Sequence, residues 1–531
     1  MAAVVGLRKQ QFKHEVEHEI ISKPFYRKLL INFSIFNREY CSLSPREAEI
    51  DSSQLGYHDL LYSDISLSDC TFSSDDLHAA STDASANPYY SYFEENILST
   101  VISREPSVLG ISIIAANQVV PAFTLANLIK ERIPQIHIVI GGPWCSHVRE
   151  KLAPKLGMFP FIDSLIVFEG EESLYRLVLA LGGELPISEV PNHVLNRDGS
   201  PATCVKHCEL NMDNLPTPIF NQKDLNKYDT VATFPIQASR GCYWGKCTFC
   251  SYPLLEPKYK VRNIEKVIKD IRVLTDSFGA KTIHFSDAII SPNYADKLSK
   301  ALLVANLNIE WIIFAKFEKA FSKKLIEQMA KSGCICINWG LESGCNRILK
   351  TINKSYSLDA TQKIIRFAAE AGIHNRILIM YGLPTETLPD ALQTVDFVEK
   401  NLAYIGSISY GYYHPEINTP MEKYWDDSVI NLQQDSTTDL ALSYPWAGNI
   451  DTGGLKILIG KYKSIQLSIS ALHRSKIGEG FPASIKNALT GPRKDFMIKS
   501  IKTGEGSTIR IESMVAESFP SGKRRIWYEI Q

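Results

Sequence analysis

The chain has little of what marks nucleic-acid-binding, membrane-spanning or secreted proteins. Its 57 Lys and Arg residues are balanced by 58 Asp and Glu residues, and no basic stripe offers a site for a polyanion. The first eight residues are too few, and residues 9–19 too charged, for a secretory signal peptide. We therefore expect a cytoplasmic protein with reduced thiols and neither a nucleic-acid nor a membrane partner.

One segment has no charged residue at all, and its length raises the alternative of a transmembrane helix. This segment spans residues 106–129. Gly110, Asn117, Gln118 and Pro121 interrupt it, and buried polar groups are costly in lipid. The pattern instead predicts a buried strand, a polar turn and a helix that begins near Pro121.

Strand and helix patterns alternate in the first half of the chain. Apolar strands are expected at 108–114, 136–140 and 164–168, with helices at 121–132 and 173–181 and a further short strand at 190–195. This alternation predicts a parallel, doubly wound sheet. Gly141 and Gly142 follow the second strand and Gly170 follows the third, so a bulky ligand could approach the carboxyl edge of the sheet there. A tight turn explains the Gly-Gly pair equally well.

A longer alternation follows between residues 234 and 412. Strands are expected at 234–238, 282–285, 309–314, 334–339, 376–381 and 408–412, with helices at 264–278, 294–305, 323–332, 358–371 and 389–402. Six such units predict a partial barrel in which the strands lie in sequence order. Functional residues in barrels of this kind gather where the strands end.

Charged residues stand at several of these strand ends. Asp287 follows the second strand, Lys316 the third and Glu342 the fourth, and a glycine lies two residues away on each side of Glu342. We take all three as candidate cofactor-binding residues, although a salt bridge at the rim explains Lys316 equally well. For Glu386, after the fifth strand, a charge partner at a helix N-terminus is the favoured interpretation.

Three cysteines stand directly after the first barrel strand. Cys242, Cys247 and Cys250 form a C-x4-C-x2-C array. Three thiolates can hold a metal centre and leave one position open, as on a [4Fe–4S] cluster with one free iron. A zinc site would need a fourth ligand, and no Cys or His follows until His284. Three plain buried cysteines are the remaining alternative.

A three-cysteine loop after the first strand of a six-unit barrel, with Phe249 before the last cysteine, resembles the radical S-adenosylmethionine (SAM) superfamily. The resemblance covers residues 230–420, and the loop has one residue more between its first two cysteines than the commonest family spacing. It implies that the three cysteines bind a [4Fe–4S] cluster, that Phe249 lies near the adenine of SAM, and that Asp287 and Glu342 line the SAM pocket. It also implies reductive cleavage of SAM to a 5′-deoxyadenosyl radical, with an electron donor such as a flavodoxin or ferredoxin.

The part before the barrel resembles the cobalamin-binding domain of the B12-dependent branch of this superfamily. The matching segments are Val108–Ser112, Ile138–Gly142 and Phe168–Glu171. The resemblance implies bound cobalamin near the three strand-end glycines. None of the 12 histidines stands in an Asp-x-His-x-x-Gly arrangement, so no lower axial imidazole is expected. The usual opening strand of the domain is not evident near the N-terminus.

Together these patterns predict an α/β chain with four parts. These are a helical and loop region (1–90), a Rossmann-like cobalamin-binding domain (91–215), a radical SAM barrel (225–422) and a small α+β region (423–531) with Gly-rich turns at Gly453 and Gly454. The resemblance implies methyl transfer from SAM to a carbon of a small-molecule, peptide or natural-product substrate. A non-methylating radical rearrangement or cyclisation is one alternative, and a binding scaffold that has lost the chemistry is another.

Overall fold

The computed structural model describes a large part of the chain. The described residues are 73–84, 87, 89–197, 200–204, 210–220, 233–425, 439–444, 448–476, 501–503 and 509–511. Most of the predicted region 1–90 therefore lies outside them. Helix α4 (Ser74–Thr82) replaces part of the surface loop that the Ser-rich sequence suggests there, because the Ser73 side chain caps it by accepting from the Asp76 N–H. By their contacts, the described residues up to Gln466 form one compact unit and those from Leu467 another.

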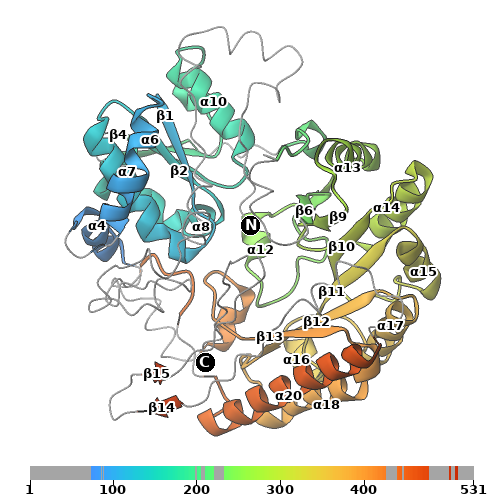
Figure 1. Ribbon diagram of the computed structural model, residues 1–531. Coiled ribbons are helices and arrows are strands. Elements are labelled where there is room, and N and C mark those ends of the chain that lie inside the picture. The colour runs from blue at the N-terminus through green and yellow to red at the C-terminus, as the bar shows by residue number, and fades with distance from the viewer. Residues whose placement is uncertain are drawn as a thin grey trace. The chain divides into compact units, whose positions relative to one another are not determined.

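The first sheet contains five strands in the order β1-β2-β3-β4-β5 (Figure 1). They are β1 (Val108–Ser112), β2 (His137–Gly141), β3 (Ser164–Ile166), β4 (His193–Arg197) and β5 (Ser200–Cys204). The first three are parallel, as predicted. The last two are antiparallel, and the strand order does not reverse as it would in a doubly wound sheet. The prediction is wrong at this point: β4 already runs antiparallel to β3, and only two residues join β4 to β5, so short a connection that it makes an antiparallel hairpin.

Helices cover both faces of this sheet. Helix α7 (Val119–Arg132) packs in the same core as Leu109 and Ile111 of β1, while α10 (Glu171–Leu181) shares a second core with Val108. Alternate residues of the strand thus point to opposite, fully apolar layers. The uncharged segment is therefore a buried strand and helix, and among the described residues no helix is both long and apolar enough to cross a membrane.

Gly142 is required by the turn that follows β2. Its φ of +104° suits only glycine, and a Cβ atom there would lie 2.6 Å from the Ile113 carbonyl oxygen. We predict that Gly142→Ala lowers the free energy of unfolding by roughly 2–4 kcal/mol, measured by denaturant unfolding. Gly183→Ala is the matched control, since Gly183 has φ +79° with no atom within 4 Å of the added Cβ and should lose only about 1 kcal/mol. Equal losses in the two variants would contradict the steric argument.

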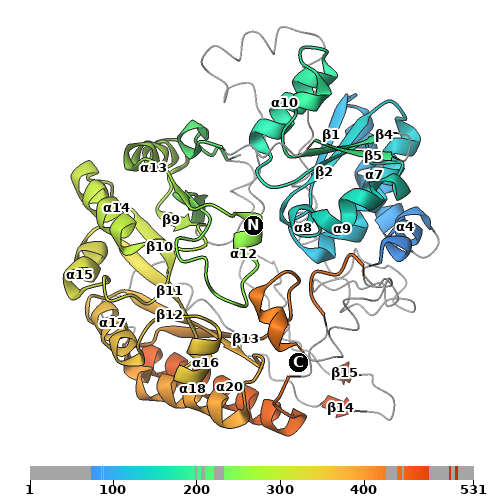
Figure 2. The same cartoon turned by 180° about the vertical axis from the view of Figure 1, so that it is seen from behind.

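The second sheet has six parallel strands in the order β13-β12-β11-β10-β9-β6, which confirms the predicted partial barrel. The strands are β6 (Thr233–Ile236), β9 (Thr282–Phe285), β10 (Glu310–Ala315), β11 (Cys334–Glu342), β12 (His374–Tyr381) and β13 (Ser407–Tyr412). Helices α13 (Ile264–Phe278), α14 (Pro292–Ala305), α15 (Lys323–Lys331), α17 (Leu358–Glu370) and α18 (Leu388–Lys400) connect them along the outer face (Figure 2). A further short helix, α16 (Asn346–Thr351), follows β11 and was not predicted.

Local signals explain why these helices begin and end where they do. The side chain of Asn263 caps α13 by accepting from the Glu265 N–H, and Gly279 ends it with φ +64°. Ser291 caps α14 in the same way, with Pro292 at the first helical position. The barrel therefore follows from short-range sequence patterns.

The C-terminal part differs from the prediction. Gly453 and Gly454 do not form a turn but lie in the first turn of α20 (Thr452–Lys476). Asp451 accepts a hydrogen bond from the Gly454 N–H at 2.7 Å and so starts the helix. Strands β14 (Ile501–Thr503) and β15 (Ile509–Ile511) form an antiparallel pair, and β15 overlaps residues 507–513, whose sequence predicts a strand. A second strand predicted from the sequence, at 524–530, lies outside the described residues.

Candidate functional site

The cysteine loop projects from a two-stranded ribbon at the end of β6. Its strands are β7 (Ser239–Arg240) and β8 (Lys260–Val261), which pair antiparallel. Gly241 follows β7 with φ +78°, and a Cβ atom there would lie 2.4 Å from the Lys258 carbonyl oxygen. The two ends of the loop therefore approach so closely that only glycine fits.

Asp287 anchors the start of this loop. It lies at the predicted strand end and is buried, with its carboxylate accepting from the Ala238 N–H at 3.1 Å and the Ser239 hydroxyl at 2.5 Å. Burial raises the pKa of Asp287 to about 6 in spite of these hydrogen bonds. The contacts place Asp287 beneath the loop, and its predicted role at a cofactor remains a prediction.

The three thiols are free and partly exposed. Gly245 adopts φ +57° and its N–H lies 3.4 Å from the Cys242 sulfur, so the glycine absorbs the additional residue between the first two cysteines. Burial raises the pKa of the Cys247 thiol, and that of Cys250 to about 11. Both thiols are therefore protonated near neutral pH, and binding a metal centre would release their protons.

Two lysines lie beside the thiols. Lys316 is buried, with its Nζ 4.0 Å from the centre of the Trp244 ring and 3.5 Å from a Glu318 carboxylate oxygen. Burial lowers the pKa of Lys316, and its positive charge acts on Cys247. The structure thus places Lys316 in a rim ion pair and also next to the cysteine loop, and its role at a cofactor stays a prediction.

Lys354 is the second lysine, and nothing in the sequence pointed to it. Its Nζ lies 3.0 Å from a carboxylate oxygen of Glu342, and the two side chains are 8% and 13% exposed. Glu342 ends β11 at a register shift and has φ +59°, a rare conformation for a residue other than glycine. Burial alone would lower the pKa of Lys354, but Glu342 and Cys247 outweigh it and raise that pKa, so the ammonium stays charged.

A cavity of about 350 Å³ opens beside the loop. Phe249 and Cys250 line it from the loop, Met380 from β12 and Tyr412 from β13. The Lys354 Nζ lies 6.0 Å from the centre of the Phe249 ring. The cysteine loop and the strand ends therefore meet around one partly aromatic cavity, which suits an organic cofactor or substrate.

Within the part of the chain that the structure describes, no three Cys, His, Asp or Glu side chains gather closely enough to hold a single metal ion. A cluster of four irons needs its thiolate ligands farther apart than one ion does. Three thiols on one glycine-bearing loop, next to two lysines that favour the thiolate form, provide the donor set for such a cluster.

The three predicted glycines lie at the carboxyl edge of the first sheet. Packing accounts for two of them, because a Cβ atom on Gly141 would lie 3.0 Å from the Ile166 oxygen and one on Gly142 would strike Ile113. At Gly170 an added Cβ would make only an ordinary contact, at 3.8 Å. The predicted contact of these glycines with cobalamin remains a prediction.

Glu386 does not serve as the charge partner of a helix N-terminus, because Thr387 and Asp390 form the capping box of α18. Its carboxylate instead accepts from the Gly382 and Leu383 N–H groups at 2.6 and 3.2 Å. Its other oxygen, Oε1, is buried and has no hydrogen-bond partner among the described residues.

Burial raises the pKa of Glu386 from 4.5 to about 7, which gives a pH prediction. At pH values between the unfolded pKa of 4.5 and the folded pKa of about 7, the folded chain binds more protons than the unfolded chain. The contribution of Glu386 to the free energy of unfolding therefore falls as the pH rises through this range, by a total of about 3 kcal/mol. Glu386→Gln should remove that part of the slope in denaturant unfolding at pH 5 and pH 7.5. The same slope in both proteins would contradict the assignment.

Comparison with known proteins agrees with this geometry. Residues 236–398 match the family model described as the radical SAM superfamily. The chain is 27% identical over 340 residues to an uncharacterized methyltransferase of Pyrococcus horikoshii, covering 62% of this chain and 70% of that protein. It is 24% identical over 356 residues to cytidylyl-2-hydroxyethylphosphonate methyltransferase of Streptomyces wedmorensis, covering 59% and 65%.

The fold is similar to that of the cobalamin-dependent SAM radical enzyme OxsB with aqua-cobalamin bound. The TM-score is 0.58 at 18% identity, with 75% of this chain and 64% of OxsB covered. The similarity thus extends beyond the barrel and includes the part before it. Residues 236–398 thus match the radical SAM superfamily, the relatives indicate an enzyme, and the fold over most of the chain is similar to that of a cobalamin-dependent radical SAM enzyme.

Proposed function

We propose that the chain is a cobalamin-dependent radical SAM methyltransferase that acts on a carbon atom of a small-molecule or peptide substrate. The observation that carries this proposal is the junction of the two sheets. The three-thiol loop opens on a cavity at the barrel rim, and its ribbon contacts the carboxyl edge of the Rossmann-like sheet through Arg240 and Glu169. The naming of both relatives as methyltransferases supports the reaction type.

Each group near the loop has a role in this proposal. Cys242, Cys247 and Cys250 hold a [4Fe–4S] cluster, and the edge with Gly141, Gly142 and Gly170 holds cobalamin. When bound, the cluster supplies the electron that cleaves SAM and the cobalamin supplies the methyl group. An electron donor such as a flavodoxin or ferredoxin reduces the cluster.

Side chains beside the cysteine loop and around the cavity orient SAM and keep water out. Glu342, fixed by Lys354, accepts a hydrogen bond from the SAM ammonium group. Phe249 provides an apolar wall beside the adenine. The rings of Tyr412 and Tyr413, which also line the cavity, exclude water from the radical chemistry.

The test combines cofactor analysis with the products of SAM. After anaerobic reconstitution with iron, sulfide and cobalamin, we expect about four irons per chain and bound cobalamin. With a reductant, a methyltransferase of this type forms both S-adenosylhomocysteine and 5′-deoxyadenosine. Formation of 5′-deoxyadenosine alone would contradict methyl transfer and favour a rearrangement or cyclisation. A chain that binds no iron would instead support a scaffold that has lost the chemistry.

A further inference from the structure

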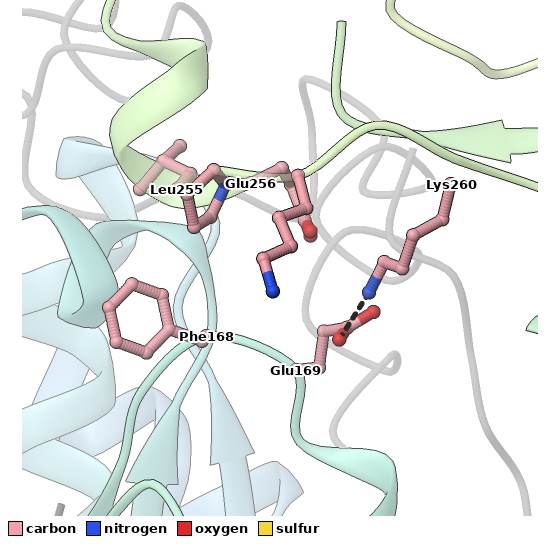
Figure 3. Close-up of a pocket in the computed structure, with 7 residues that line it drawn as sticks. Phe168, Glu169, Leu255, Glu256 and Lys260 are labelled. Carbon is pink, nitrogen blue, oxygen red and sulfur yellow. Dashed lines mark hydrogen bonds and ion pairs between the residues drawn. The ribbon is translucent and has the colours of Figure 1, made fainter. Parts of the chain in front are cut away.

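A carboxylate of the first domain reaches into the base of the cysteine loop (Figure 3). Glu169 follows β3, and its two oxygens lie 3.0 Å from Nη1 of Arg240 and 2.5 Å from Nζ of Lys260. Arg240 and Lys260 are directly opposite each other in β7 and β8. One side chain from outside the barrel therefore joins both strands of the ribbon that carries the cysteines. We call Glu169, Arg240 and Lys260 the carboxylate clamp.

The clamp is shielded from solvent. The side chains of Glu169, Arg240 and Lys260 are 6%, 12% and 19% exposed. Burial alone would raise the pKa of Glu169, but the hydrogen bonds from Lys260, the Leu210 N–H and Arg240 outweigh it and lower that pKa. In a shielded site such pairs are screened little by salt, and removing Glu169 takes the carboxylate from Lys260 and leaves Arg240 with Glu171.

The backbone beside the clamp is held in an unusual conformation. Phe168 has φ +60°, which a bulky residue seldom adopts, and its N–H donates to the Ser146 hydroxyl at 2.7 Å. The Arg149 guanidinium lies 4.7 Å from the centre of the Phe168 ring. These contacts fix the turn that presents Glu169 to the ribbon.

The two domains pack closely around the clamp. Phe168 and Glu169 face Leu255, Glu256 and Lys258 of the cysteine loop across a gap of about 10 Å³, close to the volume that one water molecule needs (Figure 3). Leu255 ends α12 (Tyr252–Leu255), which begins two residues after Cys250. The first domain thus contacts the cysteine loop on both sides of its three thiols, at Arg240 and at α12.

We propose that Glu169 is a positioning residue for the cysteine loop. Asp287 fixes the loop from the barrel, and Glu169 fixes it from the first domain by contacting Arg240, two residues before Cys242. The conformation of the first domain therefore acts on the arrangement of the three thiols. The link between Glu169 and a cluster rests on the proposed function, whereas the link between Glu169 and the loop does not.

Hydrogen exchange of the metal-free chain tests the clamp without any cofactor. In Glu169→Gln we expect exchange of amides in residues 239–261 to quicken by about tenfold or more, with β1 and β2 unchanged. Glu171→Gln is the matched control, because Glu171 also pairs with Arg240, at 2.5 Å, but is 27% exposed, whereas Lys260 pairs with Glu169. In Glu171→Gln the amides of residues 239–261 should exchange nearly as fast as in the wild type. Equal acceleration in both variants, or acceleration throughout the chain, would overturn the proposal.

A second measurement follows the cluster itself. Reconstituted Glu169→Gln should keep about four irons per chain, but its reduced cluster should give an altered electron paramagnetic resonance spectrum, and kcat for SAM cleavage should fall more than KM rises. Glu169→Asp keeps the charge, so it should restore part of the wild-type spectrum and part of the wild-type kcat. An unchanged spectrum and kcat in Glu169→Gln would refute the positioning role.

If Glu169→Gln does not fold, Lys260→Met removes one arm of the clamp and leaves the Arg240 pair, and the same local acceleration is expected. If the wild-type chain binds no iron, the proposed function fails, but hydrogen exchange in the metal-free chain still decides whether Glu169 holds the loop.

Discussion

Replacement of Cys247 by alanine is expected to abolish 5′-deoxyadenosine formation after anaerobic reconstitution. Cys247 lies between the other two thiols of the loop in sequence, and the positive charges of Lys354 and Lys316 act on it. If the three cysteines hold the cluster as proposed, this change leaves only two ligands. The expected fall in SAM cleavage therefore exceeds the ~10- to 100-fold cost of losing a residue that only supports a metal ligand. Chromatographic measurement of 5′-deoxyadenosine against the wild type checks the prediction.

The matched control for this experiment is Cys334→Ala. Cys334 is also a free cysteine of the barrel, but it is buried in β11, where its thiol lies 3.9 Å from the Cys336 carbonyl oxygen. We expect this variant to keep about four irons and most of its SAM cleavage. If Cys247→Ala still produced 5′-deoxyadenosine, Cys247 would not be a cluster ligand.

The barrel could be predicted from the sequence because its signals are local. Each strand is a short apolar run, and each helix has its own cap, such as Asn263 before α13 or Ser291 before α14. Consecutive parallel units then leave little freedom in strand order. The same local information located the cysteine loop and the strand-end residues Asp287, Lys316 and Glu342, although it did not establish their roles.

The contacts that organise the site could not be predicted in this way. Glu342 and Lys354 are 12 residues apart, and Glu169 and Arg240 are 71 apart. Each pair depends on how the loops pack against each other once the sheets have formed. The spacing of residues in the sequence does not predict such contacts. Glu169 belongs to a segment that resembles the cobalamin-binding domain, yet its carboxylate points to the cysteine loop. Lys354 had no signal, because a lysine after a short helix is ordinarily a solvent-exposed residue.

Replacement of Lys354 by methionine should destabilise the chain strongly, since it leaves the Glu342 carboxylate largely buried without its cation. Removing one partner of a buried ion pair typically costs about 3–5 kcal/mol, and methionine has a similar length, so the change in packing is small. Denaturant unfolding measures the loss. SAM cleavage should fall as well, because Glu342 would no longer be fixed beside Cys247.

The double variant Glu342→Gln/Lys354→Met separates the charge from the packing. Without the carboxylate no buried charge remains uncompensated, so the double variant should recover much of the stability that Lys354→Met loses. Its SAM cleavage should stay low, because the proposed contact with the SAM ammonium requires the carboxylate. A double variant less stable than Lys354→Met would show that the pair does not act through its charge, and wild-type SAM cleavage in it would exclude Glu342 from SAM binding.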